Sequence, residues 1–234
     1  MSKPYRLHYA PDNASLIVRL VLEEMEQPYE TVLVDRRAGA HKSQGYRKLN
    51  PAGLIPVLET PDGPIFETGA ILLWLADRHG LMAPAPQLAD RADFLKWLFF
   101  TSNTLHAGMR MLFYPEQYIG PDPTRQADLR LHMQGEMRRH LSALDAFAGE
   151  SPPWFGATAP SVLDFYVACL LRWMVLYPKG GSGWFDLAYW PHLQALAARL
   201  EPCVSVKRAI DAEGLGPSPF TAPVYAIPPE GSVT

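Results

Sequence analysis

The N-terminal residues carry the hydrophobic pattern of a strand, a helix and a second strand. Residues 5–9 alternate apolar side chains with Arg6 and His8, the period of two that is typical of a β-strand. Residues 15–27 then place apolar side chains at helical spacing, and residues 29–34 form another strand-like run. A crossover helix joins its two strands in parallel, so this segment predicts a βαβ unit.

Residues 50–77, NPAGLIPVLETPDGPIFETGAILLWLAD, predict two more strands and a helix. The first of these strands begins at Ile55-Pro56, an acidic turn follows the strand, and the helix begins at Glu67-Thr68. The polar loop before this run holds one further helical turn. The predicted order is βαβαββα, which is the order of a thioredoxin-like α/β domain.

Helical spacing dominates the rest of the chain, as in an all-α bundle. Helices are predicted at residues 88–113, 123–148, 161–173 and 190–212. The predicted divisions are a thioredoxin-like domain at 1–82, the linker APAPQ at 83–87, an all-helical domain at 88–215 and a tail at 216–234.

The predicted tail contains five prolines and little helical spacing, so we expect an extended segment over the surface. Its apolar residues, which include Phe220 and Tyr225, indicate that it docks on the protein. The helix at 161–173 begins with Ser161-Val-Leu-Asp164, a capping box in which Asp takes the place of Glu or Gln.

Composition narrows the possible functions. Of the 234 residues, 48% are hydrophobic and 19% are charged, and the net charge of -3 gives no basis for binding nucleic acid or an anionic membrane. There is no run of about 18 apolar residues and no apolar signal core, so we expect a cytoplasmic protein that does not span a membrane. Cys169 and Cys203 form no CxxC pair, and no metal-ligand spacing is present, so no metal is expected.

Residues 55–68 combine two features that suit a peptide carrying a carboxylate. Proline cannot donate to a β-ladder and fits the first residue of a strand, and a cis peptide bond at Pro56 would free the backbone of Ile55 for an extended peptide. The unpaired N–H groups at the helix start, Glu67-Thr68, favour an anion.

This ordered run resembles the glutathione-binding half of the cytosolic glutathione transferases. The resemblance implies glutathione as co-substrate, with Ile55, before the cis Pro56, pairing with its cysteinyl backbone. Glu67 and Thr68 match the acid and hydroxyl that hold the γ-glutamyl end. The capping box also resembles one at the start of a buried helix in this family. A homodimer is implied as well.

The loop His41-Lys42-Ser43 resembles a motif of the plant-type phi class, in which His and Lys contact the glycyl carboxylate. A cation beside a carboxylate in a partly exposed cleft is favourable on charge grounds. The alternative is a solvated basic loop.

The turn before the first helix would hold the group that activates the glutathione thiol. Residues 10–15 resemble the approach of the bacterial beta class, but Ala14 stands where that class has Cys. Two donors remain: Asn13, similar to the Asn of nu-class relatives, and the hydroxyl of Ser15. Alternatively, Asn13 is only a turn residue and Ser15 only the helix cap. Tyr9 is a lesser candidate.

His106 lies in a run similar to one of the beta class, whose His points into the active-site cleft. Ala107 follows it where that class has Lys, and a packing role is the alternative. In this family the electrophile pocket lies between the domains. The residues expected to line it are Met109, Arg110, Phe113, Tyr114 and Trp173, of which Arg110 could meet an anionic substrate.

Three functions follow from these residues. The first is a glutathione transferase whose bound thiolate attacks a hydrophobic electrophile. The second is a glutathione-dependent disulfide reductase of nu type, which needs no protein Cys. The third is a transferase fold reused as a non-catalytic protein-binding module, with the tail as a contact.

Overall fold

A computed structural model describes residues 4–233, so parts of the predicted first domain and tail, residues 1–3 and 234, lie outside the described residues. Four strands form one mixed sheet in the order β2-β1-β3-β4. Strand β1 (Tyr5–Tyr9) pairs in parallel with β2 (Tyr29–Leu33). On its other side β1 pairs in antiparallel with β3 (Val57–Thr60), which pairs with β4 (Gly63–Phe66).

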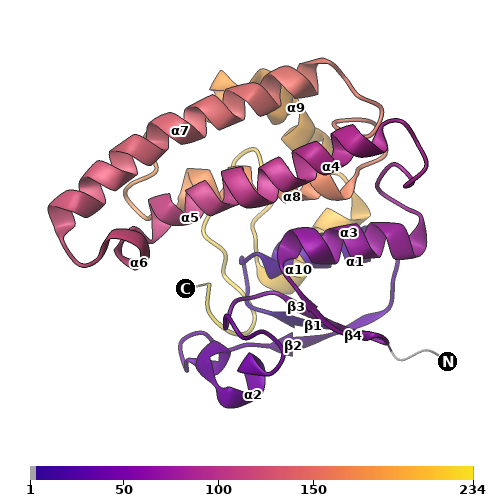
Figure 1. Cartoon of the computed structure of the whole chain (residues 1–234), viewed down its shortest axis with the longest axis horizontal. Coiled ribbons are helices and arrows are strands. Elements are labelled where there is room, and N and C mark those ends of the chain that lie inside the picture. Colours follow the sequence, from indigo (N-terminus) through magenta and orange to yellow (C-terminus); the bar gives the residue numbers. More distant parts are fainter. Residues whose placement is uncertain (1–3, 234) are drawn as a thin grey trace.

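Helices flank this sheet on both faces (Figure 1). Helix α1 (Ser15–Glu24) and helix α3 (Thr68–His79) pack together on the face toward the long helices, and short α2 (Gln44–Arg47) lies on the other face. The inward side chains of α1 are fully buried because both the sheet and the later helices cover them. The order of elements confirms the predicted βαβαββα thioredoxin-like fold.

The second half of the chain is helical, as predicted. Its elements are α4 (Arg91–Phe100), the π-helical segment η2 (Thr101–His106), α5 (Ala107–Phe113), α6 (Glu116–Ile119), α7 (Pro123–Gly149), α8 (Val162–Leu176), the short η3 (Leu187–Tyr189), α9 (Pro191–Leu200) and α10 (Val204–Glu213). Helix α8 is the core of this part, since almost all of its side chains are buried. It packs against both α1 and α9 and so joins the two halves of the chain. Within residues 4–233, no helix has both the length and the apolar character needed to cross a membrane.

The predicted capping box starts α8. The Ser161 hydroxyl accepts a hydrogen bond from the Asp164 N–H at 3.2 Å, and the Asp164 carboxylate accepts one from the Ser161 N–H at 2.6 Å. The second carboxylate oxygen accepts from the Gly156 N–H at 2.7 Å. The motif therefore caps the helix and also ties the preceding loop to it.

Two predicted boundaries were wrong. Strand β3 begins at Val57, after Ile55-Pro56, because Pro56 has no N–H to contribute to the ladder. The predicted uninterrupted helix at 88–113 begins at Arg91 and contains the π-helical turn η2, which the spacing of apolar residues did not indicate. Such turns are rare and often occur at functional sites.

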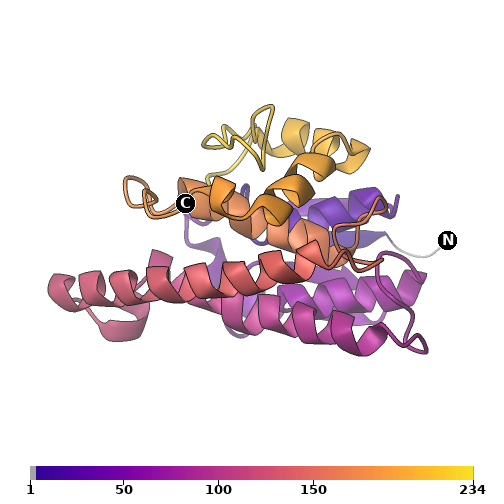
Figure 2. The ribbon, with the colours of Figure 1, turned by 90° about the horizontal axis from the view of Figure 1, so that it is seen from above.

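Residues 214–233, which follow α10, form no helix, yet they are docked on the protein (Figures 1 and 2). Phe220 is fully buried, and the Ile227 N–H donates to the Gly214 carbonyl at 2.9 Å. Further along, the Val233 carbonyl accepts a hydrogen bond from Arg36, in the loop after β2, at 3.2 Å. The tail therefore reaches the edge of the sheet and lies beside the cavity described next.

Candidate active site

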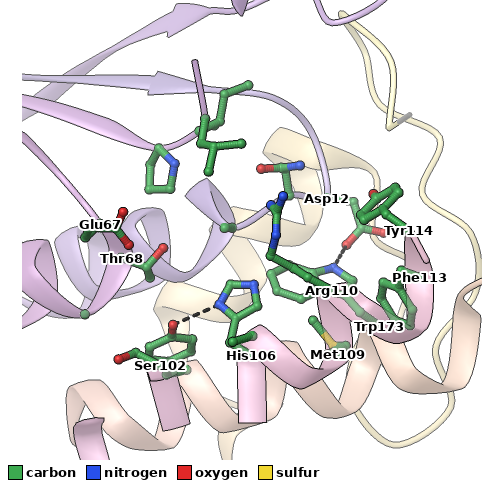
Figure 3. A pocket seen from close by; sticks show the side chains of 18 of the residues that line it. Asp12, Glu67, Thr68, Ser102, His106, Met109, Arg110, Phe113, Tyr114 and Trp173 are labelled. Atoms are coloured by element: carbon green, nitrogen blue, oxygen red, sulfur yellow. Dashed lines mark hydrogen bonds between the residues drawn. The ribbon is translucent and has the colours of Figure 1, made fainter. Parts of the chain in front are cut away.

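A cavity of about 1210 Å³ lies between the sheet with its helices and the helical half of the chain (Figure 3). Figure 3 shows Glu67 and Thr68 on one side, with Phe113 and Tyr114 across from them. His106 projects between these two sides. The volume exceeds what one drug-sized ligand needs, so the cavity has room for two molecules side by side.

The loop before β3 forms part of the first wall. The Ile55–Pro56 peptide bond is cis, and both residues line the cavity. Two buried side chains hold the residue before them: the Asn50 amide donates to the Leu54 carbonyl at 2.8 Å and the Tyr46 hydroxyl donates to the same oxygen at 2.9 Å. Two polar side chains therefore fix this loop, and one of them, Asn50, itself lines the cavity. Asn50 was not predicted as a site residue.

Glu67 and Thr68 sit at the start of α3 and both line the cavity. Glu67 has φ 70°, a region that residues other than glycine seldom adopt, and its side chain is exposed. Thr68 is the first helical residue and is buried. The unpaired N–H groups of the first turn and the hydroxyl of Thr68 thus lie beside an exposed carboxylate. This arrangement can bind both charges of an amino acid group.

His41 lines the cavity, whereas Lys42 is exposed and is not among the lining residues. The Nδ1 atom of His41 is buried and has no hydrogen-bond partner within residues 4–233. Burial, and then the charges of Lys42, Arg36 and Arg47, lower the pKa of His41. Arg36 also lines the cavity and was not predicted, although it stands in the same basic loop.

The two candidate thiol donors occupy different surroundings. Asn13 and Ala14 line the cavity, and Asn13 is half-buried. Ser15 is fully buried outside the lining, where its hydroxyl accepts from the Ala10 N–H at 3.2 Å and donates to the Ala10 carbonyl at 3.0 Å. Ser15 is the first residue of α1, and its hydroxyl holds the preceding strand end in place. Tyr9 is also buried outside the lining, and its hydroxyl donates to Glu230 of the tail.

A buried ion pair fixes the turn that carries Asn13. Arg172 of α8 donates to both carboxylate oxygens of Asp12 at 2.9 Å, and the Trp173 indole donates to the same carboxylate at 2.7 Å. The Asp12 N–H donates to Glu213 of α10 at 2.7 Å. Neither side chain of the Asp12–Arg172 pair is exposed.

This ion pair was not predicted. Arg172 is the one charged residue in the apolar run FYVACLLRW, and an arginine there has to be paired when the helix is buried. That isolated charge was the available signal, but nothing in the sequence indicated Asp12 as the partner.

His106 is the last residue of η2, and its Nδ1 atom lies 2.8 Å from the Tyr166 hydroxyl. Burial, with a smaller effect of the Arg110 charge, lowers the pKa of His106 to about 4. The imidazole is therefore neutral at neutral pH. A neutral ring that accepts a hydrogen bond from the Tyr166 hydroxyl at Nδ1 keeps its Nε2–H as a donor.

We expect the His106 imidazole to titrate with a midpoint near pH 4, well below the usual value of about 6.5. Because the unfolded chain takes up the proton near pH 6.5 and the folded one does not, this group reduces stability as pH falls from about 6.5 to 4. Nitrogen-detected NMR of the imidazole measures the midpoint directly. A midpoint near pH 6.5 would contradict this lowering of the pKa.

The second wall is apolar and largely aromatic. Met109, Phe113, Tyr114 and Trp173 all line the cavity, together with Arg110. The structure adds lining residues that were not predicted: Ser102 and Asn103 from η2, Tyr177 and Lys179 after α8, and Tyr225 and Val233 from the tail. Tyr225 of the tail therefore faces the cavity of its own chain.

The fold and cavity define a class: a thioredoxin-like domain joined to a helical bundle, with a peptide-sized site between them. The model of the glutathione S-transferase N-terminal domain family matches residues 14–78, and that of the C-terminal domain family matches residues 122–199. The chain belongs to the cytosolic glutathione S-transferase family.

Relatives match over most of the chain. Glutathione S-transferase GST-4.5 of Xanthomonas campestris pv. campestris is 29% identical, over 90% of this chain and 99% of the relative. The disulfide-bond oxidoreductase YfcG of Escherichia coli is 26% identical, over 90% of this chain and 96% of the relative. A sphingomonad glutathione S-transferase in complex with glutathione is 28% identical, covers 90% of this chain and all of that one, and superposes with a TM-score of 0.71.

Proposed function

We propose that the protein is a glutathione transferase that conjugates the glutathione thiolate to hydrophobic electrophiles. The observation that carries this proposal is that two different walls line the same cavity. One wall is polar and contains Glu67, Thr68 and His41, and the other wall is aromatic. Asn13 stands in the same lining. Glutathione would occupy the polar wall, and its thiol would lie between Asn13 and the electrophile.

The chain's own residues would bind, orient and activate the thiol. A thiol with a pKa near 8.5 is mostly protonated at neutral pH, so its thiolate has to be stabilised. The Asn13 amide donor and the first N–H groups of α1 would provide this by hydrogen bonding to the sulfur. The thiolate then forms a bond to the electrophilic carbon, the leaving group departs with its electron pair, and the thiol proton goes to solvent.

Glutathione binding is the first test. Calorimetric titration should show binding at millimolar glutathione or below, and Glu67→Ala should weaken it about tenfold because a charge-assisted hydrogen bond to the γ-glutamyl end is lost. Glu150→Ala, an exposed acid outside the cavity lining, is the matched control and should leave the affinity unchanged. Failure of the unchanged protein to bind glutathione would reject the proposal.

A glutathione-dependent disulfide reductase is the second candidate. Two observations favour it. The turn before α1, residues 10–15, has Ala14 and no cysteine, and one relative that matches over most of the chain is named a disulfide-bond oxidoreductase. In this reaction one glutathione thiolate attacks a sulfur of the disulfide, the other sulfur leaves as a thiolate, and a mixed disulfide with glutathione forms. A second glutathione thiolate then attacks the glutathione sulfur of that mixed disulfide, which releases the second thiol and leaves glutathione disulfide as the oxidised product. Assaying a mixed disulfide beside a chlorinated nitrobenzene separates the two candidates, because turnover of the disulfide alone would replace conjugation as the function.

The third candidate, a non-catalytic binding module, depends on a tail that is free to meet a partner. The tail instead contacts its own chain through Glu230 and Val233, and Tyr225 faces the cavity. These contacts favour a role for the tail within the site.

A further inference from the structure

Two cationic side chains line the aromatic half of the cavity without a carboxylate partner. Within residues 4–233, neither Arg110 nor Lys179 forms an ion pair. Arg110 makes only long hydrogen bonds to neutral groups, at 3.4 Å to the Tyr118 hydroxyl and 3.4 Å to the Gln117 amide oxygen. A guanidinium has five N–H donors, so most of those on Arg110 remain for a ligand.

An unbroken row of four aromatic rings runs along this half of the cavity. The ring centroids of Tyr114 and Phe113 are 6.4 Å apart, those of Phe113 and Tyr177 are 6.2 Å apart, and those of Tyr177 and Tyr225 are 5.6 Å apart. All four residues line the cavity. The row crosses from α5, through the segment after α8, to the tail, so three distant parts of the chain build one apolar surface.

One cation lies at each end of the row. The Arg110 guanidinium carbon is 6.0 Å from the Tyr114 ring centroid, and the Lys179 ammonium is 5.5 Å from that of Tyr225. Both side chains are therefore held beside an aromatic face and neither charge is neutralised; Arg110 is half-buried and Lys179 is exposed. A planar ligand lying on the row would reach a cation with a substituent at its edge.

The carboxylates in the cavity lining do not cancel these charges. The Asp12 carboxylate is fully engaged by Arg172 and Trp173. The other acid in the lining, Glu67, stands at the start of α3 on the opposite wall, as Figure 3 shows. The aromatic half consequently offers a positive potential next to an apolar surface.

We propose that the second substrate is an aromatic electrophile carrying an anionic group, a carboxylate or a sulfonate; this inference rests on the transferase function proposed above. The ring lies against the aromatic row and the anionic group contacts Arg110 or Lys179. For an aryl halide, the glutathione sulfur forms a bond to the ring carbon that bears the halogen. That carbon–halogen bond then breaks, the halide leaves with the electron pair, and the thiol proton goes to solvent.

A matched pair of substrates tests this preference. Initial rates are measured with 4-chloro-3-nitrobenzoate and with its methyl ester, and each kcat/KM is divided by the uncatalysed rate constant with glutathione. We expect the normalised value for the carboxylate to exceed that for the ester by about tenfold or more, as one charge-assisted hydrogen bond supplies. The preference should shrink as sodium chloride is raised, because salt screens partly exposed charges.

Variants connect the preference to the two cations. The ratio of the normalised kcat/KM for the carboxylate to that for the ester should fall toward one in the combined Arg110→Gln and Lys179→Gln variant. Arg110→Lys should retain part of the ratio, since it keeps the charge but not the planar fork. Lys207→Gln, an exposed lysine on α10 away from the cavity lining, is the control and should keep the wild-type ratio.

Each opposite outcome has a distinct meaning. Turnover of the ester without preference for the carboxylate overturns this inference and leaves the transferase function standing. A preference that survives in the double variant also overturns it. Glutathione binding with turnover of neither substrate rejects conjugation, and this inference with it. If the variants alter only the glutathione dependence of disulfide reduction, the two cations serve a second glutathione and the anionic electrophile is excluded.

Discussion

Replacing Asn13, the proposed thiol donor, with Ala should lower kcat/KM for the proposed conjugation by about 10- to 100-fold, because the thiolate would lose a hydrogen bond worth about 1.5–3 kcal/mol. The same loss should raise the pKa of the enzyme-bound glutathione thiol by about one to two units. Asn13 lies in the turn before α1 and lines the cavity with a side chain that has an N–H donor. Its neighbour Ala14 also lines the cavity but has no such donor. Asn13→Asp should do more harm, because it replaces the donor with a negative charge beside the developing thiolate.

The pKa of the bound thiol can be followed by the ultraviolet absorbance of its thiolate across a pH series. Ser15→Ala provides the contrast, because the Ser15 hydroxyl is fully buried and bonded to the Ala10 backbone. That change should lower the free energy of unfolding while leaving the pKa of the bound thiol in place. If Ser15→Ala raised this pKa and Asn13→Ala did not, the assignment would have to be reversed.

Much of the fold was predictable because its signals are local. The strand, turn and helix of residues 50–77 are encoded by Pro56, a short acidic turn and the Glu67-Thr68 helix start, all within one continuous stretch. The capping box at Ser161 and Asp164 spans only four positions and was equally readable. Such motifs specify backbone conformation through neighbours in sequence, so they do not depend on the rest of the chain.

The missed features depend on contacts between distant segments. Asp12 and Arg172 are separated by 160 positions, and no pattern near Asp12 distinguishes its carboxylate from that of an ordinary turn residue. Tyr225 joins the cavity lining only because the tail folds back over the loop after α8. Lys42 matches a family motif in sequence, but its side chain is exposed and is not among the residues that line the cavity, so its contact with glutathione stays a prediction.

Replacing Arg172 with Met should lower the free energy of unfolding by about 3–5 kcal/mol, because it leaves the Asp12 carboxylate buried and unpaired. The guanidinium also donates to the carbonyls of Leu215, Pro219 and Val224 at 3.0–3.2 Å, so the start of the tail loses these three hydrogen bonds as well. Equilibrium urea unfolding, monitored by tryptophan fluorescence, measures the change.

A matched exposed ion pair provides the control. Arg208 pairs with Glu23 at 3.1 Å, and its side chain is 53% exposed. Because exposed pairs contribute at most about 1 kcal/mol, Arg208→Met should shift the unfolding midpoint only slightly. A loss at Arg172 no greater than that at Arg208 would contradict the importance of the buried pair.

A double-mutant cycle with Asp12→Asn separates the pair from the packing of Arg172. Asp12 has φ 47°, a left-handed conformation that Asn adopts readily, so this change removes the charge without straining the backbone. With the carboxylate gone, Arg172→Met should lower the free energy of unfolding much less than it does alone.

The Arg172→Met variant also has a functional readout, since Asp12 directly precedes Asn13. Arg172→Met loosens the turn that carries Asn13. It should therefore raise the pKa of the thiol of bound glutathione, even under conditions in which the protein remains folded. An unchanged thiol pKa would show that the ion pair supports the fold alone and does not position the thiol donor.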